Sequence, residues 1–149
     1  MIKHIEIRFI DEGAAARAVL LEEEMPRTCK ELLRHLPLEG TATHARYSGS
    51  EVAMLISSDI HIEREKATSA VVPGDVAYVW LNRDDHYGLE EDVSEICWFY
   101  DRDALPQMFE GPVCVNVFAR IVGETDKFYA ACADTRISGV KKVRISLVD

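Results

Sequence analysis

The sequence predicts a mainly β protein in which about eight antiparallel strands close into a barrel capped by two α-helices. Three observations support this fold class. Most apolar segments are short and either alternate with polar residues or are rich in β-branched ones. Only two segments carry an apolar stripe with helical spacing, and the turns between segments are short. Closure is favoured because it removes exposed strand edges. With 149 residues, the chain is long enough for one domain, residues 1–149, with its own core.

The first two strands form a predicted hairpin. Ile2–Ile10 alternates, so that one face carries the apolar side chains of Ile5, Ile7 and Phe9. A turn at residues 11–13 leads into a second extended segment, residues 14–22. Its alanines are poor strand formers, so a helix is the local alternative. The short turn containing glycine favours the hairpin.

Two helices are predicted, over residues 23–38 and 124–135. Pro26 suits a first helical turn, and Thr28 with Glu31 fits a capping box. The buried stripes should consist of Cys29, Leu32, Leu33 and Leu36 in the first helix, and Phe128, Ala131 and Cys132 in the second. Each helix has a single apolar stripe, which suits a lid on one open end of a barrel.

The remaining strands are predicted from apolar or β-branched runs separated by turn residues. Ser48-Gly49-Ser50 is expected to form a turn or bulge, and residues 137–139 a turn. Residues 59–69 and 82–92 are charged and should be surface loops. The expected strands cover residues 41–47, 52–57, 76–81, 94–100, 112–122 and 140–148.

Composition excludes several classes of function. The net charge of −9 and the lack of a basic patch argue against binding to nucleic acid or to anionic membranes. No apolar run approaches the roughly 20 residues of a membrane helix, and the N-terminus lacks a secretory signal, so a cytoplasmic location is expected. The four cysteines and five histidines have no metal-binding spacing. We therefore expect no metal and no cofactor; a metal site would need ligands that only folding brings together.

Several motifs, in their order along the chain, resemble those of the cyclophilins. They look most like the small bacterial cyclophilin-like proteins of unknown function. The motifs are PRTCKELL at residues 26–33, HAR at 44–46, PGDVAYVW at 73–80, SEICWF at 94–99, VFARIVG at 117–123 and GVKKVRI at 139–145. Each motif is short, and the resemblance depends on their shared order over most of the chain.

The resemblance implies a cyclophilin-like barrel and a peptidyl-prolyl isomerase activity. In that family, an arginine polarises the prolyl amide and lowers the rotation barrier of ~18–20 kcal/mol. Arg46 occupies the matching position, but His44 stands two residues before it instead of next to it. Cys97 replaces a phenylalanine of the proline pocket, so that pocket is incomplete. A weak prolyl isomerase is therefore the alternative function.

The main hypothesis is a groove near Arg46 that binds a small molecule or a short peptide. Its guanidinium would bind a carboxylate or an amide oxygen. The candidate ligand-binding residues are His44, Arg46, Glu51, Glu95 and Cys97. As alternatives, Arg46 faces solvent or pairs with Glu51 or Glu95. Cys97 is either a thiol activated by a nearby Arg46 or an inert buried one. The long apolar strands leave a homo-oligomer open.

Overall fold

The computed structural model describes residues 1–148 and shows an eight-stranded, closed antiparallel barrel. The strand order around the barrel is β1-β10-β3-β4-β6-β5-β9-β2. The strands are β1 (His4–Phe9), β2 (Ala14–Leu20), β3 (Leu38–His44), β4 (Glu51–Ile56), β5 (Asp75–Leu81), β6 (Val93–Phe99), β9 (Asn116–Val122) and β10 (Lys141–Val148). A separate two-stranded ribbon is formed by β7 (Gln107–Met108) and β8 (Gly111–Pro112). The predicted fold class is confirmed.

The barrel is closed by β1, which pairs on one side with β2 and on the other with β10. In the latter pairing, His4 lies opposite Val148 and Phe9 lies opposite Val143. The burial pattern of β1 alternates strictly, as predicted, because successive side chains point to opposite faces of the sheet.

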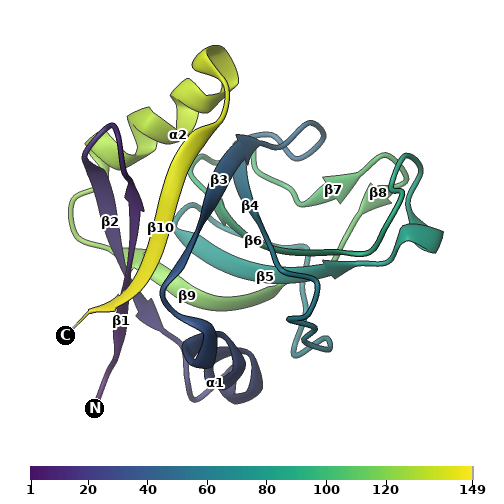
Figure 1. Ribbon diagram of the computed structural model, residues 1–149, viewed down its shortest axis with the longest axis horizontal. Coiled ribbons are helices and arrows are strands. Elements are labelled where there is room, and N and C mark those ends of the chain that lie inside the picture. The colour runs from purple at the N-terminus through teal and green to yellow at the C-terminus, as the bar shows by residue number, and fades with distance from the viewer. Residues whose placement is uncertain (149) are drawn as a thin grey trace.

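The two helices close opposite ends of the barrel (Figure 1). They are α1 (Pro26–His35) and α2 (Asp126–Ser138). Phe128 of α2 packs against Phe9 and Trp98 in the barrel, with ring centroids 5.3 Å and 6.2 Å away. Cys29 and Leu32 of α1 are buried in the same core. Both helices therefore act as the predicted lids.

A second apolar layer lies outside the barrel, on the outward face of β5 and β6. It contains Ala77, Val79, Leu81, Cys97, Phe99 and Val115. Partly buried residues that pack against it include Ala104, Met108 and Val113, from the long segment that follows β6 and includes the β7–β8 ribbon. This part of the sheet is therefore covered on both faces, which explains why β5 is almost continuously buried.

The start of α1 differs from the prediction. Thr28 and Glu31 do not form a capping box, and the helix begins without a side-chain cap from its own N-cap residue. Glu65, from the long loop between β4 and β5, accepts hydrogen bonds from the backbone N–H groups of Arg27 and Thr28, at 3.0 and 2.8 Å. A distant carboxylate thus supplies the cap.

Several predicted boundaries are wrong. The first helix covers Pro26–His35 instead of residues 23–38, and β3 begins at Leu38 instead of residue 41. The segment 112–122 is not one strand, because residue 115 bridges to Thr68 and β9 begins only at Asn116. The second helix runs to Ser138, so residues 137–139 are not a separate turn. The strand predicted over residues 41–47 ends at His44, and Arg46 lies in the following loop.

The turn after β3 depends on Gly49, as expected for the Ser-Gly-Ser segment. Gly49 has a φ of 68°, and a Cβ there would lie 2.4 Å from the backbone oxygen of Asp103. Only glycine fits this close contact between two loops without a shift of the backbone. The contact fixes the loop that leads into β4.

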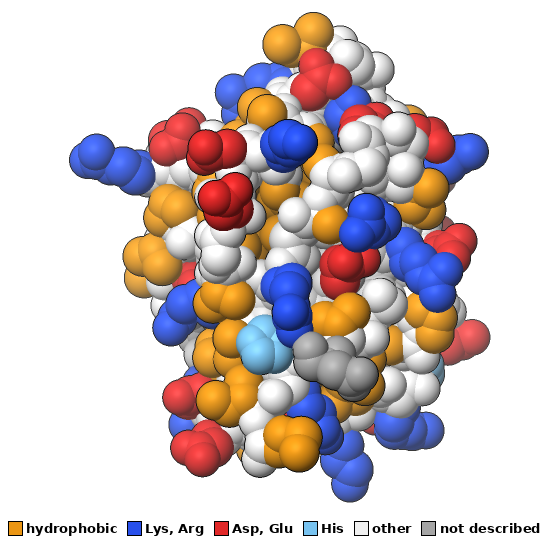
Figure 2. All heavy atoms as spheres, turned by 90° about the vertical axis from the view of Figure 1, so that its left-hand side faces the viewer, with side chains coloured by type: hydrophobic (Ala, Val, Ile, Leu, Met, Phe, Trp, Pro, Cys, Tyr) orange, Lys and Arg blue, Asp and Glu red, His pale blue; other side chains and the backbone are white. Residues whose placement is uncertain are grey.

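The surface seen in Figure 2, on the side where β1, β2 and α2 lie in Figure 1, carries basic and acidic side chains in alternation. On β1, Arg8 forms an ion pair with Glu6 at 2.9 Å. This face has no broad area of one charge. Within the described chain, neither helix has the length and apolarity needed to cross a membrane.

Candidate functional site

The five predicted site residues fall into two groups. His44 and Arg46 line a pocket beside the C-terminal end of α2. Glu51, Glu95 and Cys97 come together on the outward face of β4 and β6. We predicted that all five residues line a single groove, and this prediction is wrong because the two groups lie in different places. The binding role of each residue stays a prediction.

The pocket beside α2 has a volume of about 500 Å³. Its walls come from the end of β3, the loop that follows, and the end of α2, and include Thr43, His44, Arg46, Gly49, Thr135, Arg136 and Val140. Arg46 is exposed. Within residues 1–148 it makes no hydrogen bond or ion pair, so its five N–H donors are available to a ligand.

His44 is held in one orientation by two hydrogen bonds. Its Nδ1 lies 2.9 Å from the carbonyl oxygen of Ala45, and its Nε2 lies 2.7 Å from the hydroxyl of Tyr100. A carbonyl can only accept, so Nδ1 carries the proton, and the Tyr100 hydroxyl donates to Nε2 of the neutral ring. Burial lowers the pKa of His44, and Arg136 lowers it further. The imidazole is thus neutral at pH 7.

Arg136 is a pocket residue that the sequence prediction missed. It lies in the last turn of α2, and its guanidinium donates to the carbonyl of Gly49 across the pocket, at 3.2 Å. The helix was predicted to end at Thr135. The buried positions Phe128, Ala131, Cys132 and Thr135 continue the helical spacing, and Gly139 ends it. This pattern could have extended the helix past Arg136.

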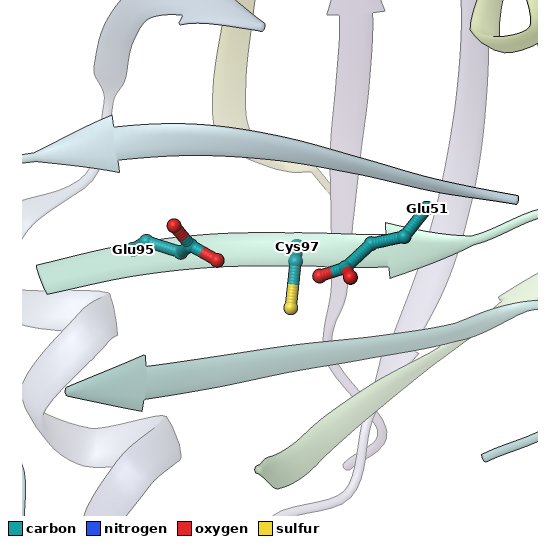
Figure 3. A group of neighbouring side chains, drawn as sticks. All are labelled: Glu51, Glu95 and Cys97. Atoms are coloured by element: carbon teal, nitrogen blue, oxygen red, sulfur yellow. The ribbon is translucent and has the colours of Figure 1, made fainter. Parts of the chain in front are cut away.

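The outward cluster is formed by two strands in register. Glu95 and Cys97 are two residues apart on β6 and so share a face. Glu51 pairs with Phe99 across β4 and β6, which places it on the same face next to Cys97. Both carboxyl groups point toward the thiol (Figure 3), and the three donor atoms lie within 4.8 Å of one another.

The electrostatics of this cluster favour protonated side chains. Burial raises the pKa of Glu95 to about 8, and the charge of Glu51 contributes to the rise. Burial also raises the pKa of Glu51, against hydrogen bonding from Ser48 and Cys97. Burial and the two carboxylates raise the pKa of Cys97 well above its usual value. Near neutral pH, the cluster therefore holds protons that a cation could displace.

These positions exclude two of the expectations. Cys97 belongs to the outer apolar layer, not to the pocket of Arg46, and its pKa is raised rather than lowered. An activated thiol is therefore not supported. Arg46 pairs with neither Glu51 nor Glu95, as no contact joins them in the part of the chain that the structure describes.

The family of the chain follows from its sequence. The model of a family described as a protein of unknown function, DUF3830, matches residues 7–147. This covers nearly the whole barrel. The chain belongs to the DUF3830 family. No curated protein is significantly similar in sequence to this DUF3830 chain.

Solved structures share the fold of this DUF3830 protein. The structure of McbB in complex with tryptophan has a TM-score of 0.70 at 19% identity, over 95% of this chain and 44% of that one. The chain thus spans less than half of McbB. The hypothetical protein AF2241 from Archaeoglobus fulgidus has a TM-score of 0.61 at 21% identity, over 97% and 94% of the two chains. At these identities the likeness concerns the fold alone. The resemblance to cyclophilins stays a prediction.

Proposed function

We propose that this DUF3830 protein binds a small metabolite that carries a carboxylate, in the pocket beside α2. The observation that carries the proposal is the presence of Arg46 and Arg136, from two separate segments, in the lining of one cavity of about 500 Å³. That volume lies within the usual range of small-molecule sites, about 300–1,000 Å³.

Charge supports an anionic group in the ligand. The chain has a net charge of −9, yet two guanidinium groups meet here. Arg46 has no partner among the described residues, so it can offer a planar pair of N–H donors to a carboxylate. Arg136 already donates to Gly49, which leaves it further donors.

The wall that carries Arg136 suggests the rest of the ligand. It is formed by the C-terminal end of α2, whose terminal carbonyl groups carry partial negative charge and favour cations. An α-amino acid would suit this pocket, because its carboxylate could bind the arginines and its ammonium group could bind the helix end. McbB, in which 44% of the chain has a similar fold, was solved in complex with tryptophan. Amino acids are therefore the first class of ligand to test.

The test is calorimetric titration of the protein with a panel of amino acids and simple carboxylates. We expect at least one to bind, and Arg46→Gln to weaken binding about tenfold or more through the lost charge-assisted hydrogen bonds. Arg64→Gln is the matched control, because Arg64 is also exposed but lines a different pocket. Equal affinity in the wild type and Arg46→Gln would contradict the proposal.

Weak prolyl isomerisation is the alternative that the cyclophilin resemblance implies. It would need an apolar pocket for the proline ring next to Arg46. The position that corresponds to the family's pocket phenylalanine is Cys97, which lies in the outer layer and away from Arg46. A coupled assay on an Xaa-Pro peptide distinguishes the two functions. Turnover that disappears in Arg46→Gln would favour the isomerase.

A further inference from the structure

A second set of side chains has a chemistry that amino-acid binding does not use. Glu51, Glu95 and Cys97 place two carboxyl groups and a thiol within 4.8 Å of one another, on the outward face of the sheet (Figure 3). None of the three lines the pocket of Arg46. From these positions we propose that Glu51, Glu95 and Cys97 bind a divalent transition-metal ion of the Zn²⁺ type.

The donor set points to this class of ion. Carboxylate oxygens alone would suit Mg²⁺ or Ca²⁺, whereas a thiolate is a soft ligand that those ions avoid. Zn²⁺ accepts both, with bonds of about 2.0–2.2 Å to oxygen and about 2.3 Å to sulfur. Three protein ligands leave a fourth position of a tetrahedral ion for water. The ligand set is therefore that of an open site.

Neither carboxyl group has the cationic partner that buried carboxylates usually have. Glu51 is only 4% exposed, yet no lysine, arginine or histidine within residues 1–148 pairs with it. Its contacts are with Ser48 and Cys97. Ser48 already donates its hydroxyl to the carbonyl of Gln107, at 3.1 Å. Glu95 makes no hydrogen bond or ion pair in the described chain, and meets only the like charge of Glu51.

In their ionised forms, two carboxylates beside an apolar layer and without a cationic partner are costly for a folded protein, unless a proton or a cation compensates their charge. The side chains around them include Ala77, Val79 and Phe99, none of which supplies charge. A divalent cation would supply the missing positive charge at one point. With two carboxylates and one thiolate, the occupied site would carry a net charge of −1.

The site is also accessible. In residues 1–148, every side-chain nitrogen or oxygen that is sealed from solvent has a hydrogen-bond partner. Any carboxyl oxygen of Glu51 or Glu95 that has no hydrogen-bond partner is therefore in contact with solvent. Glu95 is only partly buried, which provides a route for an ion.

The experiment uses Co²⁺ as a spectroscopic probe, with the full-length protein freed of metal by a chelator. Binding of Co²⁺ to a thiolate produces a near-ultraviolet charge-transfer band that carboxylates alone do not give. We expect one equivalent to bind, the band to appear, and Zn²⁺ to abolish it by competition. Glu95→Gln should weaken Co²⁺ binding about 100-fold or more, since it removes a direct ligand.

Controls separate the site from other thiols and from loss of folding. Cys97→Ser should abolish the band, whereas Cys114→Ser should keep it, because Cys114 is only partly buried and lies outside the cluster. Circular dichroism of each variant checks that the barrel is retained, and Glu95→Gln, at a partly buried position, tests the site independently of Cys97. The proposal is overturned if the wild type shows no thiolate band at pH 8. It is also overturned if folded Glu95→Gln binds Co²⁺ as the wild type does.

Discussion

The carboxylate of Glu65 accepts hydrogen bonds from both the backbone N–H and the hydroxyl of Thr28, at 2.8 and 2.6 Å, across 37 positions of sequence. Asn116 of β9 completes the arrangement, because its side-chain oxygen accepts from the backbone N–H of Glu65 at 3.0 Å. One buried carboxylate thus ties the long loop before β5, the start of α1 and the barrel together.

Replacement of Glu65 by glutamine should destabilise the fold. The neutral amide keeps the shape but loses the charge that strengthens the bonds from the backbone N–H of Arg27 and from the N–H and hydroxyl of Thr28. We therefore expect a loss of about 1–3 kcal/mol in the free energy of unfolding. Urea denaturation followed by circular dichroism measures it. Glu63→Gln, two residues away at an exposed position, should change stability by much less. Equal losses in the two variants would refute the capping role.

Low pH should remove the stabilisation that the Glu65 carboxylate provides. Burial alone would raise the pKa of Glu65, but the hydrogen bonds from Thr28 and Arg27 outweigh it and hold the pKa below its usual value. The contribution is therefore complete above the unfolded pKa of about 4.3, and is lost as the pH falls through the folded pKa. Wild type and Glu65→Gln should converge in stability only after the pH has fallen below the folded pKa of Glu65. A difference that persists there would mean that charge is not responsible.

Glu95→Gln should have the opposite effect on metal-free protein. The folded pKa of Glu95 is raised to about 8, so the wild type loses stability as the pH rises from about 4.3 toward 8. Glutamine cannot ionise and avoids this loss. We expect the variant to be more stable at pH 8 by about 1–3 kcal/mol, allowing for the partial exposure of Glu95. Thermal unfolding in the presence of a chelator, at pH 5 and pH 8, checks the difference. The advantage should be small at pH 5.

Arg136→Gln should raise the pKa of His44. Burial, which is the largest cause of the lowered pKa, remains in the variant, but the repulsion from the guanidinium is removed. The imidazole would then become protonated at a higher pH than in the wild type. NMR titration of the His44 ring measures this directly. An unchanged midpoint would show that Arg136 and His44 do not interact across the pocket.

Gly49→Ala should be more destabilising than Gly123→Ala. Both glycines have positive φ, at 68° and 82°, so an alanine is strained at either position. Only at Gly49 would the new methyl group also lie 2.4 Å from the backbone oxygen of Asp103, while Gly123 has open space. We expect about 1 kcal/mol at Gly123 and at least twice that at Gly49. Chemical denaturation of both variants provides the comparison, and similar losses would contradict it.

The sequence was sufficient for the barrel and for most of its strands, because alternation is a local signal. In β1 the pattern of Ile5, Ile7 and Phe9 needs no knowledge of distant residues. The apolar run at residues 112–115 misled us for the opposite reason. Val113 and Val115 pack in the outer layer, and Val115 bridges to Thr68 instead of β5. Local hydrophobicity cannot distinguish such a segment from a strand.

Two of the three residues in the cluster on the outer face could be placed together from the sequence. Glu95 and Cys97 are two residues apart, so a strand must place them on one face. The addition of Glu51 depends on its register opposite Phe99, which only the paired strands reveal. Likewise, Arg46 and Arg136 meet because α2 covers the end of the barrel near β3. No spacing along the chain indicates that these two arginines line the same pocket.

The pairing of β1 with β10 has a consequence for biosynthesis. Their hydrogen bonds join the first and the last strands of the described chain, with His4 opposite Val148. During translation, one edge of β1 stays unpaired until β10 has been synthesised and has left the ribosome. Contacts so distant in sequence form slowly, and an open sheet is prone to aggregation in the interval. We therefore expect nascent chains that stop before Lys141 to depend on chaperones.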